Sequence, residues 1–286
     1  MPSRPGALIL VLLLANPAHA AELLGAWEWT RPQKDHGGFS AIEMQSGGTR
    51  ATILSDRARM FDVRIARDGT DGIESIAVTG QHRLANVASR RGRPDTEGLA
   101  LSPDGRLFVS IEGPAGVLEY NADGSEATAL PDLPIVDRLA LNRGAEALAI
   151  DASGALWTVA EQSVDGTFPV FIFRNGSWQD GPVLADDGSG FVPVGLDFDD
   201  TGRLYLLERR LALPSGFRTR LRRLTVAGNR TESIRTLLQT DAGQHDNLEG
   251  ISVWRDDRDR LIATMIADDN FFPLQRTELV EYILPD

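Results

Sequence analysis

Apolar and polar residues follow one repeated pattern along this chain. Residues 96–113 read TEGLALSPDGRLFVSIEG, residues 145–162 read AEALAIDASGALWTVAEQ, and residues 193–209 read PVGLDFDDTGRLYLLER. In each copy, two short apolar runs flank a Gly-containing turn, which is the pattern of a tight β-hairpin. Looser copies occupy residues 39–57 and 248–270. Such repeats predict a repeat architecture built from antiparallel strands.

The spacing of the copies predicts five units. The equivalent apolar residues Ile42, Leu99, Leu148, Leu196 and Ile251 are separated by 57, 49, 48 and 55 residues, which is room for four short strands each. The residues left at the two ends of the chain together make one further step of similar length. We therefore expect an all-β fold, a single β-propeller of five four-stranded blades, with six blades as the alternative. Strands from the N- and C-terminal ends would close the last blade and so remove a free sheet edge.

Glycines recur at the start of the inner strands of this predicted propeller. They are Gly98, Gly195 and Gly250. We expect a structural role for them, because backbones that approach each other closely near a crowded axis leave no room for a side chain.

The first twenty residues have a different character. Arg4 is followed by an apolar stretch over residues 7–15, and residues 18–20 read AHA, a small-residue cleavage site. The apolar stretch is too short to span a bilayer. We therefore expect residues 1–20 to be a cleaved signal peptide and residues 21–286 to be the propeller domain. The mature protein would then be periplasmic or secreted, in a bacterium, with no membrane span.

The composition excludes several classes of function. The chain has no cysteine, so thiol nucleophiles and cysteine metal ligands are ruled out. Its formal net charge of -12 repels phosphate backbones and argues against nucleic-acid binding. No G-x-S-x-G motif marks an exposed esterase serine. We expect a monomer that acts on or binds a small molecule.

Acidic residues recur at matching places in the repeats, on either side of each turn. In the second unit, for example, Glu97 and Glu112 are equidistant from the turn at Asp104 and Gly105. Because the innermost strand of each blade lines the tunnel of a propeller, these acids are expected to crowd one mouth of it. The other members of the set are Asp56 in the first unit, Glu146 and Glu161 in the third, Glu208 in the fourth, and Glu249, Asp268 and Asp269 in the fifth.

Crowded carboxylates need positive charge nearby, and the residue pattern leaves two sources open. Arginines close to the acids in the chain could form a ring of salt bridges; they are Arg57, Arg143, Arg209 and Arg276. Alternatively, a calcium ion would accept this set of oxygen ligands. The candidate calcium ligands are Glu97, Glu112, Glu146, Glu161, Glu208, Glu249 and Asp268. Either arrangement marks the mouth as the candidate functional site.

Several strings of the sequence resemble the bacterial phytase-like family, known for the esterase-like activity of phytase. These strings are GGFSAIEM at residues 37–44, NRGAEALA at 142–149, LYLLERRLALPSGFRTRLRR at 204–223, DNLEGISV at 246–253 and DDNFFPLQRTELVEY at 268–282. The resemblance extends over nearly the whole mature chain. It implies an exported propeller that hydrolyses phosphoesters or other esters.

The resemblance also implies roles for individual residues. By similarity to calcium-dependent propeller phytases, calcium at the tunnel mouth would hold phosphate oxygens and lower the pKa of an attacking water. The expected catalytic residues are Glu249, Asp268 and Asp269, with His245 as a candidate base. The expected substrate-binding residues are Arg143, Arg209, Arg276 and Asn270, of which the arginines can hold phosphate through two parallel hydrogen bonds.

Two departures from a phytase limit the substrate. Val194 stands where the fourth unit would carry a glutamate, and Lys34 is the only lysine of the chain. A phosphoester smaller than phytate therefore fits the mouth better. The fold alone leaves open another class of function, a non-catalytic periplasmic propeller that binds a ligand or a protein at the same mouth.

Overall fold

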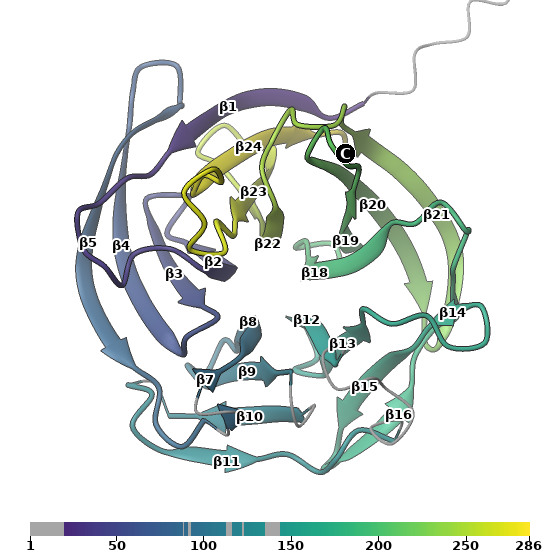
Figure 1. The fold of residues 1–286 in the computed structure, drawn as a ribbon. Helices are drawn as coiled ribbons and strands as arrows, with labels where there is room; N and C mark the ends of the chain where they lie inside the picture. The colour runs from purple at the N-terminus through teal and green to yellow at the C-terminus, as the bar shows by residue number, and fades with distance from the viewer. Residues whose placement is uncertain (1–19, 88, 91–92, 113–115, 122, 135–143) are drawn as a thin grey trace, which may run out of the picture.

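The strands of this protein form a ring of sheets around a central axis (Figure 1). The computed structural model describes residues 20–87, 89–90, 93–112, 116–121, 123–134 and 144–286. Over these residues the regular secondary structure consists of β-strands. Five antiparallel sheets contain four strands each. The predicted all-β propeller is confirmed, and the count is five blades rather than six.

Four blades are built from consecutive parts of the chain, with the first strand innermost. Blade 1 consists of β2 (Phe39–Gln45), β3 (Arg50–Ser55), β4 (Arg59–Arg67) and β5 (Ile73–Arg83). Blade 2 consists of β8 (Thr96–Leu101), β9 (Leu107–Ile111), β10 (Gly116–Tyr120) and β11 (Ala127–Ala129). Blade 3 consists of β12 (Ala145–Ile150), β13 (Leu156–Ala160), β15 (Val170–Arg174) and β16 (Ser177–Asp180). Blade 4 consists of β18 (Val192–Phe198), β19 (Leu204–Leu211), β20 (Phe217–Ala227) and β21 (Arg230–Gln239).

Blade 5 joins the two ends of the chain, as the sequence predicted. Its inner strands are β22 (Leu248–Arg255), β23 (Leu261–Ala267) and β24 (Glu278–Leu284), and β1 (Glu22–Glu28) is the outermost strand. β1 pairs antiparallel with β24 along its whole length. Two small ribbons lie outside the blades: β6 (Ser89–Arg90) with β7 (Arg93–Pro94), and β14 (Thr167–Phe168) with β17 (Leu184–Ala185). No membrane-spanning helix occurs in the described part of the chain.

The hydrophobic core is divided among the spaces between neighbouring blades. One cluster, for example, packs Phe39 and Phe61 of blade 1 against Ile266 and Leu279 of blade 5. Each blade therefore buries both of its faces, and alternate residues of a strand contact different neighbours. This explains why most inner strands are apolar in sequence almost without interruption.

Glycines allow the inner strands to approach one another, as predicted. A Cβ atom at Gly98 would lie 2.7 Å from the carbonyl oxygen of Glu146, and a Cβ at Gly250 would lie 2.7 Å from the Cα of Ala41. Gly195 has the same kind of contact with a neighbouring backbone. A side chain at any of these positions would force two blades apart.

We expect Gly250→Ala to lower the free energy of unfolding by about 2 kcal/mol, because overpacking a rigid interior displaces backbone. Urea denaturation measures this loss. Gly69→Ala is the matched control, since a Cβ there meets no atom within 4 Å. An equal effect of the two substitutions would contradict the close approach of the blades.

Candidate functional site

A β-bulge interrupts the pairing of the two innermost strands in every blade. In blade 3, Ala145 pairs with Ala160 and Ala147 with Val159, so Glu146 is the extra residue of β12. The same shift between β22 and β23 leaves Glu249 unpaired. A bulge turns a side chain out of the regular alternation, here toward the tunnel mouth. The bulges of the five blades contain Ser40, Glu97, Glu146, Val194 and Glu249.

A second ring of polar residues follows the partner strands. The repeat residue Leu148 pairs with Thr158, and Glu161 lies three residues further along the chain. Ile42, Leu99, Leu196 and Ile251 are the equivalents of Leu148 in the other blades. The residues that lie three positions after their strand partners are Asp56, Glu112, Arg209 and Asp268. We call the two rings together the acidic mouth. Among the described residues, its first ring has three carboxyls and its second ring has four carboxyls and one guanidinium.

Glu208 is not part of the acidic mouth, contrary to the sequence prediction. Its side chain is fully buried within blade 4 and accepts hydrogen bonds from Arg220 Nε at 2.7 Å and Arg222 Nη2 at 2.6 Å. Counted from the turn, Glu112 and Glu161 are the seventh residues after Gly105 and Gly154, and the seventh residue after Gly202 is Arg209. Glu208 is one residue nearer the turn and therefore points to the other face of its strand. Arg209 thus occupies the place assigned to Glu208.

Arg209 bridges acids of neighbouring blades at the mouth. Its guanidinium donates to Asn247 Oδ1 at 2.8 Å, to Glu249, and to Glu161 Oε1 at 3.3 Å. Asn247 Nδ2 also donates to Glu249 Oε1 at 2.8 Å. Burial alone would lower the pKa of Arg209, but the carboxylates of Glu249 and Glu161 raise it above its usual value. Arg209 therefore remains charged and holds Glu249 and Glu161 in place.

The remaining carboxyls of the mouth are poorly compensated. Burial, with further contributions from neighbouring acids, raises the pKa of Glu97 and Glu146 well above the usual range. Burial likewise raises the pKa of Asp268 to about 9, of Glu112 to about 8, and of Asp56 to about 7. Without a bound cation, several of these groups keep their protons near neutral pH.

Three acids at the mouth offer oxygens that converge as a hard cation requires, and Asp56 lies near them. Carboxylate oxygens of Asp95, Glu97 and Glu112 lie within 4.8 Å of one another. Asp56, whose pKa is also affected by Asp95, has a buried Oδ1 with no hydrogen-bond partner in the described structure. An oxygen-only donor set of this kind suits calcium, which binds six to eight oxygens in flexible geometry. The residues present thus fit the predicted metal.

Residues 34–271 match the model of the phytase-like family, described as esterase-like activity of phytase. The chain belongs to the phytase-like family. None of the proteins of curated function matches this sequence. The match to the family model confirms the resemblance seen in the sequence.

Solved structures resemble this phytase-like protein in fold. The catalytic domain of a GH62 α-L-arabinofuranosidase from Coprinopsis cinerea aligns over 93% of this chain and 97% of its own, with 10% identity and a TM-score of 0.56. A putative oxidoreductase (glucose dehydrogenase) from Thermus thermophilus aligns over 90% and 99%, with 16% identity and a TM-score of 0.49. A gluconolactonase from Xanthomonas campestris aligns over 86% and 72%, with 12% identity and a TM-score of 0.46. At such identities the likeness concerns the fold alone.

The other predicted residues of the phytase-like protein have varied surroundings. Asp269 accepts hydrogen bonds from the backbone of Gly38 at 2.8 Å and of Phe271 at 3.0 Å, so it holds the loop after β23. Asn270 is exposed, and Arg276 is half-exposed beside Asp246 and Glu278. Arg143 lies outside the described residues.

His245 does not face the acidic mouth. Its ring is buried, its Nε2 lies 2.8 Å from the Tyr282 hydroxyl, and its Nδ1 lies 4.0 Å from Glu278. Burial and the nearby Arg276 lower its pKa. The ring thus packs against β24, and the structure does not support the assignment of His245 as a base at the mouth.

The structure adds Asp95 and Asn247 to the mouth. Asp95 belongs to the oxygen cluster, and Asn247 contacts both Arg209 and Glu249. Each stands two residues before a bulged acid, and residues two apart lie on the same side of an extended strand. This spacing was visible in the sequence and could have identified both.

Proposed function

We propose that this phytase-like protein is an exported, calcium-dependent hydrolase that cleaves a small phosphoester or other ester at the acidic mouth. The observation that carries the proposal is the charge balance of the two rings. Among the described residues they combine seven carboxyls with the single guanidinium of Arg209. Acids crowded in this way either keep protons or recruit cations, and the family description supports ester hydrolysis.

The mouth divides into two sides with different tasks in this proposal. Asp56, Asp95, Glu97 and Glu112 would hold the cation. When bound, calcium would supply a positive centre for substrate oxygens and a more acidic water. On the other side, Arg209 compensates part of the charge of Glu249 and Glu161.

Two carboxyls on the Arg209 side would handle protons. Burial raises the pKa of Glu249, and the hydrogen bonds from Arg209 and Asn247 oppose this shift. Asp268, which has a pKa of about 9 and no arginine contact among the described residues, holds its proton at neutral pH. Glu249 would therefore act as the general base and Asp268 as the general acid. Arg209 could share an N–H with an anionic oxygen of the substrate.

Calcium titration by calorimetry, together with turnover of p-nitrophenyl phosphate and p-nitrophenyl acetate, tests the proposal. We expect calcium binding, and turnover that stops after chelation. Glu112→Gln should weaken calcium binding by roughly tenfold or more, because it removes a charged ligand. Glu232→Gln, on the exposed face of β21, is the control and should bind calcium as the parent does. The exported protein should be used, and its mass should show that it begins at Ala21.

Each negative outcome has a separate meaning. Absence of both calcium binding and turnover would contradict the proposed function. Calcium binding without turnover of either ester would favour the alternative of a non-catalytic binding propeller.

A further inference from the structure

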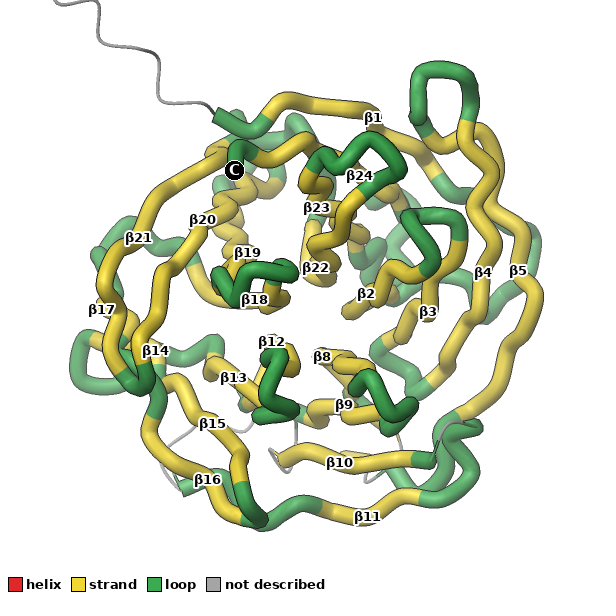
Figure 2. The backbone as a smooth tube through the Cα atoms, turned by 180° about the vertical axis from the view of Figure 1, so that it is seen from behind, coloured by secondary structure: helices red, strands yellow, loops and turns green. Residues whose placement is uncertain are grey.

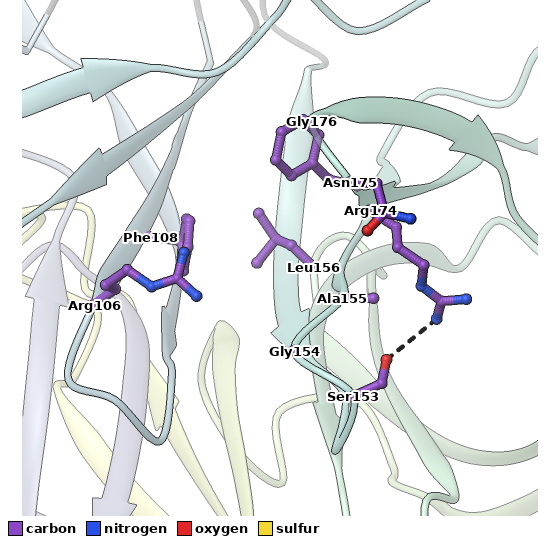
Figure 3. A pocket seen from close by; sticks show the side chains of 10 residues that line it. Arg106, Phe108, Ser153, Gly154, Ala155, Leu156, Arg174, Asn175 and Gly176 are labelled. Atoms are coloured by element: carbon purple, nitrogen blue, oxygen red, sulfur yellow. Dashed lines mark hydrogen bonds between the residues drawn. The ribbon is translucent and has the colours of Figure 1, made fainter.

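A cleft lies between blades 2 and 3 (Figure 3). It is lined by the turn at Ser153 and Gly154, at the opposite end of β12 and β13 from the acidic mouth. Its volume is about 530 Å³. Figure 2 shows this face, where loops join β8 to β9 and β12 to β13. The side chains that matter for its chemistry are Arg106, Phe108, Ser153, Leu156, Phe173 and Arg174.

The short outer strands of these two blades leave the cleft open. The outermost strand has 3 residues in blade 2 (β11) and 4 residues in blade 3 (β16). The corresponding strands β5 and β21 have 11 and 10 residues. Blades 2 and 3 therefore have short outer strands, and among the described residues no strand covers the space between them.

One accessible aromatic ring lies in the mostly polar lining of the cleft. Phe108 and Leu156 belong to the core cluster between the two blades and are almost fully buried, whereas Phe173 packs against that cluster and remains partly accessible. Trp178 lies behind Phe173, with their ring centroids 5.1 Å apart. A flat apolar group could therefore pack against the Phe173 ring and displace water from it.

Two arginines from different blades stand on the walls, as Figure 3 shows. Arg106 lies over the Phe108 ring, 5.4 Å from its centroid, and contacts Asp104 through Nε at 3.0 Å. Arg174 Nη2 contacts Asp151 and the Ser153 hydroxyl, both at 3.3 Å.

These contacts orient both guanidiniums but leave donors for a ligand. With the described residues, Arg106 uses Nε and Nη1, and Arg174 uses Nη2. A guanidinium has five N–H donors in a planar fork, so each can still bind a carboxylate. About half of each side chain is exposed.

We infer that this cleft binds a small aromatic carboxylate. The ring would lie on Phe173, and the carboxylate would accept hydrogen bonds from Arg106 or Arg174. The volume is within the range of ligand sites. An inorganic anion would gain nothing from the Phe173 ring, and a neutral aromatic would gain nothing from the charge of the arginines. The inference is independent of the function proposed for the mouth.

Calorimetric titration of the mature protein with 2-naphthoate tests this inference. We expect a dissociation constant on the order of 0.1 mM, because nearby acids partly offset the arginine charges. The double substitution Arg106→Gln and Arg174→Gln should weaken binding at least tenfold, since charge-assisted hydrogen bonds are lost. Arg258→Gln, an exposed arginine paired with Asp71 elsewhere on the surface, is the control and should leave binding unchanged. Glu112→Gln should also leave it unchanged.

Three results would overturn the inference. They are no binding of 2-naphthoate at millimolar concentration, equal binding of the neutral 2-naphthamide, and unchanged affinity of the double variant. Melting temperatures and circular dichroism of all variants would show that the fold is intact, so that a loss of binding belongs to the cleft.

Discussion

The metal-free protein is expected to gain about 3 kcal/mol of stability when the pH falls from 9 to 7, because buried carboxyls of the acidic mouth then recover protons. The folded-state pKa of Asp268 is about 9 and that of Glu112 about 8, whereas both are near 4 in an unfolded chain. A raised pKa means that the folded state binds the proton more tightly. The stability that each carboxyl contributes is complete below its pKa in the unfolded chain, and it is lost as the pH rises through its pKa in the folded protein.

Between pH 7 and 9, His36, His245 and the salt-bridged acids do not titrate. Burial lowers the pKa of His36 and His245, so their contribution is lost as the pH falls through 6.5 and would oppose the effect in that range. Salt-bridged acids with lowered pKa, such as Asp199 and Asp256, titrate below pH 4. Burial also raises the pKa of Glu43 in β2 and of Asp197 in β18, and these two carboxyls act in the same direction as those of the mouth.

Urea denaturation at pH 7 and 9, in a chelator and in calcium, measures the effect. Calcium binds the ionised carboxyls of the folded state only, so it should raise the stability at pH 9 and reduce the pH dependence. Asp268 is not among the proposed calcium ligands and should keep its part of the pH dependence. The double substitution Glu112→Gln and Asp268→Asn should reduce the pH dependence without calcium. A metal-free protein whose stability rises from pH 7 to pH 9 would contradict this account of the mouth.

Arg209→Gln is expected to reduce kcat/KM for the ester by about a hundredfold or more, as removal of a positioned donor does in other enzymes. It should also lower the free energy of unfolding by about 3 kcal/mol at pH 8 in a chelator, since Glu249 and Glu161 lose their compensating charge while remaining at least partly buried. Steady-state kinetics and urea denaturation measure the two effects.

The neighbouring arginine provides the control for this substitution. Arg210 is exposed on the same strand, and Arg210→Gln should change neither quantity. Calcium should restore part of the stability of Arg209→Gln, because a cation can replace the lost charge. If Arg209→Gln kept both activity and stability, the mouth could not depend on its single guanidinium.

The fold was predictable because each blade repeats the same local signals. The turns at Asp104-Gly105 and Ser153-Gly154 and the apolar runs beside them depend on neighbours in the chain. Gly98 and Gly250 were also informative in the sequence. Because glycine has no side chain, a neighbouring blade can approach the backbone closely at these positions. The count of five blades followed from the spacing of such signals.

The composition of the mouth was less predictable, because it depends on bulges and on contacts between blades. The prediction placed Glu208 at the mouth because it is the acid nearest to the repeat position, whereas the position itself, seven residues after Gly202, is Arg209. The partners of Glu208 are Arg220 and Arg222 on the next strand, and simple spacing in the sequence does not reveal such a pairing.

The sequence by itself determined the propeller, the number of its blades and the end of the tunnel at which acids gather, because these depend on local turns and on repetition. Only the tertiary structure decided how the charges are shared. It joined Glu161, Arg209 and Glu249 from three blades. Within the described residues it left Asp95 and Glu112 without a salt bridge, and gave Asp56 only a long one, 4.0 Å from Arg57 Nε. Electrostatic energy depends on distance and burial in space, which a repeat pattern does not contain.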